Sequence, residues 1–457
     1  MTSTELRATA ALAAVFALRL LGLFMVYPVF AHYARQLHGA TPLLIGLALG
    51  GYGLAQGLLQ IPFGLASDRI GRKGVICTGL VLFGAGSVIA AMSRSIQGVL
   101  LGRVIQGAGA IGSSVLALAA DLTREEVRTR AMAGIGMTIG LAFVAALAAG
   151  PALAAFGGLQ AIFWATAVLA ALGVAVTLLV VPTPARVARQ RGAEPVPALF
   201  GRVLKDRELL RLDFAIFALH AILTASFLAA PRLVAGAFGL PAGGEWKLYV
   251  PVLAASVVLM IPAIAVAEAR GRMKEVFIAA IVLVAASLAA LALAPDTALP
   301  IALALTGFFT AFNVMEAMLP SLITKTAPAD AKGTATGIYS SAQFLGIFVG
   351  GALGGWIWGL AGARGVLLLG LGIAVAWLAV AAGMRRPGLY STRLVRLDAA
   401  AGPAERLVER LRAAPGVVEA VAAPDEGVAY LKVDRAAFEP TALAAILGGA
   451  PPSDRPQ

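Results

Sequence analysis

Long apolar runs separated by short polar segments dominate the chain. The runs are rich in Ala, Leu, Gly and Val and do not alternate with polar residues, which favours helices over the strands of a membrane barrel. Each run has the roughly 20 residues that a helix needs to cross a hydrocarbon core of about 30 Å. The pattern predicts twelve membrane-spanning helices, at about residues 9–35, 42–66, 74–93, 96–120, 130–155, 160–182, 209–236, 246–268, 275–295, 299–324, 333–360 and 363–384.

Composition agrees with a membrane protein. The chain has 457 residues, of which 60% are hydrophobic and 13% charged, and its mean hydropathy is +0.88. Soluble domains carry about a quarter charged residues. The net charge of +12 is interpreted as topological and not as a nucleic-acid surface, because roughly 18 Lys and Arg fall in the loops on one side and about 5 on the other. The positive-inside rule then places both termini in the cytoplasm.

The predicted spans fall into two groups of six, followed by a polar tail. We expect an N-terminal six-helix half at 1–182, a basic cytoplasmic linker at 183–208, a C-terminal half at 209–388 and a soluble domain at 389–457. In the tail, strands at 394–397, 417–422 and 428–433 and helices at 402–413 and 440–447 give the order β-α-β-β-α. This is the start of a ferredoxin-like fold, with no visible fourth strand. The fold class predicted is an all-α membrane protein with a small α+β cytoplasmic domain.

One hairpin carries the densest polar signal, and a weaker copy of it returns 200 residues later. Gly64, Asp68, Gly71, Arg72 and Lys73 lie between two apolar spans. A carboxylate at a helix end favours a neighbouring helix N-terminus, and Asp121 at the end of span 4 is a candidate partner for the arginine. We interpret the hairpin as one side of a conformational switch, against the simpler interpretation of topogenic charge. The matching positions in the copy are Pro62 with Pro262, Asp68 with Glu268, Gly71 with Gly271, and Arg72 with Arg272.

Few ionisable residues lie inside the predicted spans, and such residues are costly there and default to functional hypotheses. Glu316 is the best proton-site candidate, because burial disfavours its charged form; the alternative is a neutral acid that holds helices together. His220 suits proton exchange or simple packing. Arg19 is a counter-ion for Glu316, a counter-ion for an anionic substrate, or an inter-helix hydrogen-bond donor. No metal-ligand spacing accompanies the single cysteine, Cys77, and no nucleophile–base pair or phosphate-binding motif appears, so neither an enzyme nor a cofactor is expected.

Three segments resemble a known family. Gly64-x-x-x-Asp68-x-x-Gly71-Arg72-Lys73 resembles motif A of the major facilitator superfamily. Arg103-Val104-Ile105-Gln106-Gly107 resembles motif B, and Leu21-Gly22 through Pro28-Val29 resembles the first-span motif of the twelve-helix drug/proton antiporter branch. With its soluble tail, the chain is similar to the YajR-type transporters of that superfamily.

The resemblance implies two six-helix halves that alternate access to a central site. It implies that Gly64, Asp68, Gly71, Arg72, Lys73 and Asp121 form the switch near Gly333, and that Arg103 and Gln106 act in proton coupling. The second-half copy, made of Glu268, Gly271, Arg272 and Lys274, lacks one cation and implies a weaker switch. Span 5 has Gly150-Pro151 of the antiporter motif, but alanines replace its other glycines, a departure that bears on the direction of transport.

We therefore expect a proton-coupled secondary transporter of a bacterial inner membrane that exports a small, mostly apolar compound. Its expected partners are the lipid bilayer, protons and an unidentified small-molecule substrate, with no nucleic acid. The alternatives are a metabolite or sugar-derivative exporter and, from another class, a membrane sensor that signals through its C-terminal domain. Because the tail lacks a Cys-x-x-Cys metal loop, its expected role is self-association or intramolecular docking.

Overall fold

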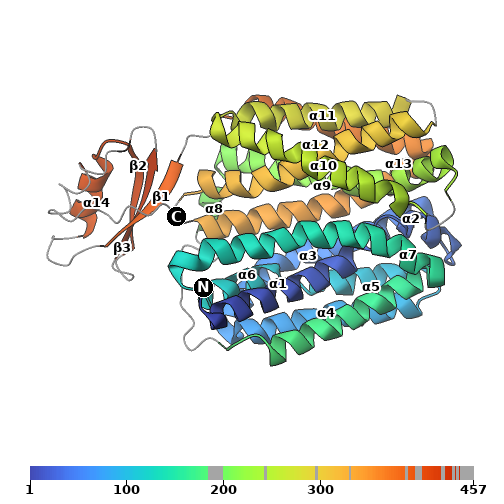
Figure 1. Ribbon diagram of the computed structural model, residues 1–457, viewed down its shortest axis with the longest axis horizontal. Coiled ribbons are helices and arrows are strands. Elements are labelled where there is room, and N and C mark those ends of the chain that lie inside the picture. Colours follow the sequence, from blue (N-terminus) through green and yellow to red (C-terminus); the bar gives the residue numbers. More distant parts are fainter. Residues whose placement is uncertain are drawn as a thin grey trace. The chain divides into compact units, whose positions relative to one another are not determined.

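The computed structural model describes residues 1–183, 199–240, 244–293, 297–328, 331–385, 390–396, 404–423, 428–434, 438 and 442. The chain forms two compact units. The first contains Met1–Arg189, Leu210–Leu319 and Gly337–Met384, and the second contains Gln190–Leu209, Pro320–Thr336 and Arg385–Gln457. The first unit is a bundle of long helices, and a small sheet with one helix lies in the second (Figure 1).

Ten helical segments in the described ranges are long and apolar enough to cross a membrane. Two of them, α7 and α13, each join two helices across a kink, at Gly157–Gly158 and at Gly362. With each of these two divided at its kink, the described bundle has the twelve predicted spans. The helices are α1 Ser3–Phe24, α2 Phe30–Tyr33, η1 Ala34–Gln36, α3 Pro42–Ile70, α4 Arg72–Met92, α5 Ile96–Ala108, α6 Gly112–Asp121, α7 Glu125–Leu179, α8 Phe200–Val203, α9 Arg207–Phe238, α10 Trp246–Ala269, α11 Met273–Leu293, α12 Ala298–Thr326 and α13 Lys332–Ala382.

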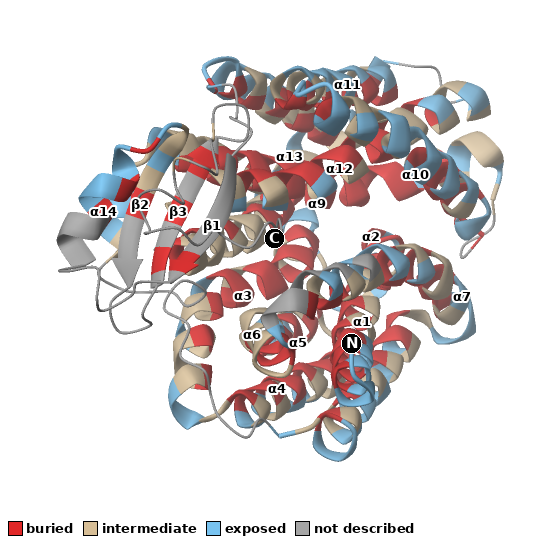
Figure 2. Ribbon diagram, turned by 60° about the vertical axis from the view of Figure 1, so that its left-hand side comes forward, coloured by how far each residue is buried: buried red, intermediate tan, exposed pale blue. Residues whose placement is uncertain are grey.

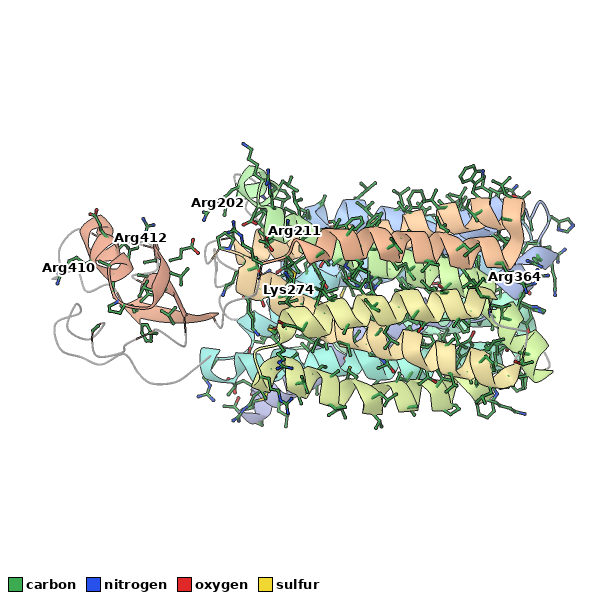
Figure 3. All side chains as sticks on the ribbon, turned by 90° about the horizontal axis from the view of Figure 1, so that it is seen from above. Arg202, Arg211, Lys274, Arg364, Arg410 and Arg412 are labelled. Atoms are coloured by element: carbon green, nitrogen blue, oxygen red, sulfur yellow. The ribbon has the colours of Figure 1, made fainter. Side chains whose placement is uncertain are left out.

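The bundle has two halves, α1–α7 and α9–α13, and buried positions gather inside each (Figure 2). Among these spans, helix α9 is the most enclosed, because 89% of its 18-residue apolar stretch is buried. For helix α10 the corresponding figure is 22%. Helix α10 is therefore apolar on its exposed face as well as on its buried face, as expected for a helix that contacts lipid. Lys274 and Arg211 lie at one end of the bundle and Arg364 at the other (Figure 3). We call these the basic end and the far end.

The backbone shows the internal repeat that the hairpin sequence predicts. Glycines with positive φ occur in pairs about 200 residues apart: Gly39 (69°) with Gly239 (58°), Gly71 (101°) with Gly271 (61°), and Gly158 (62°) with Gly362 (65°). Residues with a Cβ rarely adopt this conformation. The two halves therefore turn between spans at equivalent places.

Three predicted spans need correction. Span 1 ends at Phe24 and not near residue 35, because Pro28 has no N–H to continue the helix. The chain then makes turns before the short helix α2. Span 2 continues to Ile70, so Gly64 and Asp68 lie on the last turns of α3 and only Gly71 is left as a connection. Span 4 is broken between α5 and α6 at 109–111.

The two halves meet along α3 and α13. A Cβ placed on Gly46 would lie 2.1 Å from the backbone oxygen of Gly351, and one on Gly53 would lie 2.4 Å from that of Phe344. Such close backbone approach is typical of small residues at helix contacts in membranes. Near the far end, the guanidinium of Arg35 lies 4.6 Å from the ring centre of Trp358 in α13, which adds a cation–π contact across the same interface.

The second unit contains an antiparallel sheet in the order β1-β3-β2. The strands are β1 Tyr390–Arg396, β2 Val417–Ala423 and β3 Val428–Asp434, and α14 Ala404–Arg412 lies between β1 and β2 in the chain. Val408 and Leu411 of α14 pack on Ala420, Ala429 and Leu431 of the sheet. The predicted hairpin is confirmed, and the first strand begins four residues earlier than predicted. The predicted helix at 440–447, the fourth strand and most of the linker at 183–208 lie outside the described residues.

Candidate functional site

Arg72 is the centre of a buried charge cluster at the basic end. Its Nη1 donates to Asp68 Oδ1 at 2.6 Å, and its Nε donates to Asp121 Oδ2. The side chain of Arg72 is 4% exposed, as is that of Asp121. One guanidinium therefore joins the ends of α3, α4 and α6, and the structure brings Asp68 and Arg72 of the hairpin together with the candidate partner Asp121. Gly64 lies against Ser113 of α6, whose Oγ would be 3.3 Å from a Cβ at that position.

A lysine fixes the end of another helix in each half. Lys73 Nζ donates to Val181 O at 2.8 Å, just after α7. Lys274 Nζ donates to Met384 O at 2.6 Å, just after α13. Carbonyl groups at a helix C-terminus lack intrahelical partners and favour a cation. The two lysines therefore have the same role in both halves, which sequence spacing alone did not indicate.

The rest of the second-half copy is arranged differently from the first. Glu268 and Arg272 are both exposed, whereas Arg72 is buried. Interactions of exposed charges contribute little because water and salt screen them. The expectation that the second hairpin is the weaker switch element fits this difference in burial.

Two buried arginines lie close to Tyr52 inside the N-terminal half, with their Cζ atoms 5.8 Å (Arg19) and 5.2 Å (Arg103) from its ring centre. Arg103 donates to Gln106 Oε1 at 3.0 Å and to Leu49 O at 3.2 Å. Arg19 Nη2 donates to Tyr52 OH at 2.5 Å and to Gln56 Oε1 at 2.6 Å. These acceptors are all uncharged. The sequence-based pairing of Arg19 with Glu316 is not what the structure shows, since these hydrogen bonds of Arg19 stay within its own half.

His220 and Glu316 come together in the C-terminal half. His220 Nε2 lies 3.5 Å from Glu316 Oε1 and 2.9 Å from Gln343 Nε2, while Nδ1 lies 3.2 Å from Ile216 O. Both shorter contacts are hydrogen bonds when the neutral ring carries its proton on Nδ1. Glu316 Oε1 is buried without a hydrogen-bond partner among the described residues. The cluster of α9, α12 and α13 therefore places an acceptor nitrogen 3.5 Å from a carboxylate oxygen that has no hydrogen-bond partner among the described residues.

Sequence reasoning missed Gln343 and Tyr52, which have no signal in a single sequence because their importance comes from contacts between distant helices. It placed Asp213 at the cytoplasmic end of a predicted span without a role. In the structure Asp213 lies near the start of α9 and is 6% exposed, and neither carboxylate oxygen has a hydrogen-bond partner in the described part of the chain.

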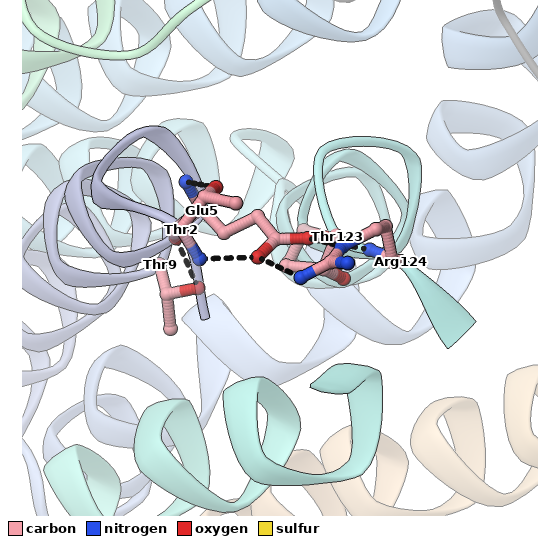
Figure 4. Close-up of polar contacts among 6 residues, drawn as sticks. Thr2, Glu5, Thr9, Thr123 and Arg124 are labelled. Atoms are coloured by element: carbon pink, nitrogen blue, oxygen red, sulfur yellow. Dashed lines mark hydrogen bonds and ion pairs between the residues drawn. The ribbon is translucent and has the colours of Figure 1, made fainter. Parts of the chain in front are cut away.

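A further contact that sequence reasoning missed ties the N-terminus to α7. Glu5 Oε1 accepts from Arg124 Nε at 2.8 Å and from Arg124 N at 3.1 Å, and Oε2 accepts from Thr2 N at 2.7 Å (Figure 4). Thr2 and Glu5 form a capping box at the start of α1. The spacing Thr-x-x-Glu is its sequence signal, although the partner Arg124 is not predictable from it.

Comparison with known proteins decides the family. The sequence profile of the Major Facilitator Superfamily matches residues 12–267 and 245–422. The chain belongs to the major facilitator superfamily. It is 45% identical over 434 residues to the inner membrane transport protein YajR of Escherichia coli K12, which covers 95% of each chain. It is 28% identical over 374 residues to the multidrug resistance protein MdtH of Edwardsiella ictaluri, which covers 77% of this chain and 90% of that one.

The fold agrees with solved members of the superfamily. A crystal structure of a D-xylose-proton symporter superposes with a TM-score of 0.69 at 15% identity, over 84% of this chain and 99% of that one. At this identity the likeness shows the fold alone. Together with the profile match, it confirms the predicted family and fold class. This superfamily member is a multi-pass membrane transporter and not an enzyme.

Proposed function

We propose that the chain is a proton-coupled secondary transporter that exports a small, mostly apolar compound by alternating access. The observation that carries the proposal is the cluster of His220, Glu316 and Gln343. A carboxyl group with one oxygen buried 3.5 Å from an imidazole nitrogen is placed to exchange a proton with it after a small approach. The name of the relative MdtH, a multidrug resistance protein, supports export of an apolar compound.

Proton binding would act on α13 through a competition for one nitrogen. Gln343 occupies Nε2 of His220 in the present arrangement. Transfer of a proton from Glu316 to Nε2 would create an imidazolium–carboxylate pair and would leave Gln343 without its acceptor. The next residue, Phe344, has its ring centre 6.2 Å from that of Tyr52 in the opposite half. A shift of α13 caused by proton transfer would therefore reach the interface between the halves.

The Arg72 cluster is proposed as the switch at the basic end. It joins three helix ends through one buried guanidinium, so that they would move as a single piece during the rocking of the halves. The excess of Lys and Arg in the loops at this end supports a cytoplasmic location for it, with both termini on that side. The predicted domain boundaries at 182, 208 and 388 are part of the same proposal.

The experiment uses purified full-length protein. A thermal-shift screen against a compound library identifies ligands, because a ligand that binds only the folded state raises apparent stability. Each hit is then loaded into proteoliposomes that contain a pH-sensitive dye. The proposal expects compound and proton fluxes in opposite directions. If every hit is transported without any proton flux, the proposed proton coupling is wrong and the protein is a transporter with another type of coupling.

A further inference from the structure

The span made of α5 and α6 is interrupted in the middle of the N-terminal half. Helix α5 ends at Ala108 and α6 begins at Gly112. The first backbone hydrogen bond of α6 is that of Val115 N to Ile111 O at 3.0 Å. In the described part of the chain, the preceding N–H groups, of Gly112 and of the two serines that follow, make no backbone hydrogen bond and form a free helix N-terminus inside the bundle. Half-helix N-termini of this kind attract negative charge in membrane transporters.

One face of α3 runs alongside this helix start. Gln56, Gln60 and Gly64 are spaced four residues apart and share that face. Gln60 Nε2 lies 3.4 Å from the position that a Cβ on Gly112 would take, and Ser113 Oγ lies 3.3 Å from the position of a Cβ on Gly64. Gln60 is 6% exposed. The start of α6 is therefore lined by a polar side chain from α3.

A chain of hydrogen bonds connects this place to Arg19. Arg19 Nη2 donates to Gln56 Oε1 at 2.6 Å, and Gln56 Nε2 donates to Gln60 Oε1 at 2.8 Å. Arg19 is 2% exposed and Ser114 is fully buried. Among the described residues, Arg19 Nε and Ser114 Oγ have no hydrogen-bond partner. One unused buried donor, Ser114 Oγ, thus belongs to the start of α6, and the other, Arg19 Nε, belongs to the opposite end of the hydrogen-bonded chain.

Among the described residues, no carboxylate accepts a hydrogen bond from Arg19. Its hydrogen bonds go to a phenol and an amide. The buried carboxylates Asp121 and Glu5 are held at the basic end by Arg72 and Arg124. A buried cation without a counter-charge is unfavourable. An anion that entered this place would supply the missing charge.

We infer that Arg19, Gln56, Gln60, Ser113, Ser114 and the first N–H groups of α6, together the Arg19 cluster, bind the carboxylate of the transported compound. The inference rests on the proposed transport function and names its substrate class as monoanionic acids with an apolar body. The cluster holds a single guanidinium, which pairs with one carboxylate, and the helix N-terminus adds about half a positive charge. Tyr52, which accepts from Arg19, contacts Phe344 of the other half, so the cluster lies one side chain away from the interface between the halves.

The test compares an acid with its neutral amide on the purified full-length protein in nanodiscs, without any ion gradient. 2-Naphthoate and 2-naphthamide share the same ring system and differ in charge. The acid is expected to bind at least tenfold tighter than the amide in titration calorimetry and to raise the unfolding temperature. Arg19→Gln should remove this preference, Arg19→Lys should retain part of it, and Ser114→Ala should weaken acid binding several-fold. Arg364→Gln, which removes an exposed charge at the far end, is the matched control and should leave the preference unchanged.

Equal binding of acid and amide, no measurable binding of the acid, or an intact preference in folded Arg19→Gln would each overturn the inference. If Arg19→Gln does not fold, the wild-type comparison and Ser114→Ala still decide. The binding test does not depend on transport. Proton-driven flux of neutral compounds without a preference for the acid would support the proposed function and reject the Arg19 cluster as a carboxylate site. A preference for the acid without proton flux would support the Arg19 cluster and reject the proposed proton coupling.

Discussion

Gln343 of α13 donates a hydrogen bond to Nε2 of His220 in α9, over 2.9 Å. The contact determines where the imidazole carries its proton, since Nδ1 lies against the carbonyl of Ile216. Because Gln343 occupies Nε2, this nitrogen does not form a hydrogen bond with Glu316 Oε1, which lies 3.5 Å away. Protonation of Nε2 therefore distinguishes a neutral imidazole bonded to Gln343 from an imidazolium paired with the Glu316 carboxylate.

The tautomer of His220 can be measured directly. The chain has 3 histidines, so 15N-histidine labelling gives a simple spectrum that His220→Gln assigns. At pH 7.5 we expect the neutral ring with its proton on Nδ1. Gln343→Leu removes the donor to Nε2 and should move the signal toward a ring protonated at Nε2. A wild-type ring that already carries its proton on Nε2 would contradict the arrangement.

The two hairpins should differ in their effect on stability. Arg72→Gln removes the guanidinium that joins the buried Asp121 carboxylate to the partly buried Asp68, which we expect to cost about 3–5 kcal/mol of unfolding free energy. Arg272→Gln, the matched change at the exposed copy, should cost about 0.5 kcal/mol or less. Denaturant unfolding of the detergent-solubilised protein measures both. Similar losses for the two variants would show that burial does not distinguish the hairpins.

Much of this architecture is predictable from the sequence, for a definite reason. Apolar run length fixes the spans, and the repeat of Gly71 and Arg72 at Gly271 and Arg272 indicates the two halves. The pairing of Arg72 with Asp121 is also predictable, because both are charges at span ends on the same side. These signals are local, or they depend only on which side of the membrane a residue occupies.

Contacts that depend on how the helices are packed are not predictable in this way. Nothing in the sequence near Gln343 indicates His220, 123 residues away. The break before α6 is hidden for a similar reason: Gly109 interrupts a run that is otherwise compatible with a helix. A Cβ at Gly109 would lie 2.2 Å from the backbone oxygen of Gly79 in α4, and only the packed structure shows this approach.

The contact between α3 and α13 should be sensitive to a single methyl group. Gly46→Ala places a Cβ at 2.1 Å from Gly351 O, so the halves must separate there. Gly372→Ala is the matched control, because no atom lies within 4 Å of its Cβ position. With Cys77→Ser as background and Ala40→Cys as a reporter near the far end, maleimide labelling should become faster in Gly46→Ala only. Unchanged labelling in a folded Gly46→Ala protein would argue against a close contact of the halves.

Within the second unit, the linker and the sheet should be close enough to cross-link. Arg202 Nη2 of α8 lies 3.3 Å from Glu419 Oε1 of β2. In the Cys77→Ser background, Arg202→Cys combined with Glu419→Cys should react rapidly with a short bismaleimide and give a cross-linked monomer. Arg202→Cys combined with Glu409→Cys on α14 is the control and should react more slowly. Equal rates for the two pairs would remove the evidence for docking of the tail on the linker.

The central claim is that Glu316 couples proton movement to transport, and one variant tests it. Proteoliposomes that contain wild-type or Glu316→Gln protein are loaded with a ligand from the thermal-shift screen. Flux is measured with a pH gradient and, separately, as exchange of labelled for unlabelled ligand without a gradient. We predict that Glu316→Gln retains exchange and loses the gradient-driven flux. Gradient-driven flux equal to that of the wild-type protein would contradict the account.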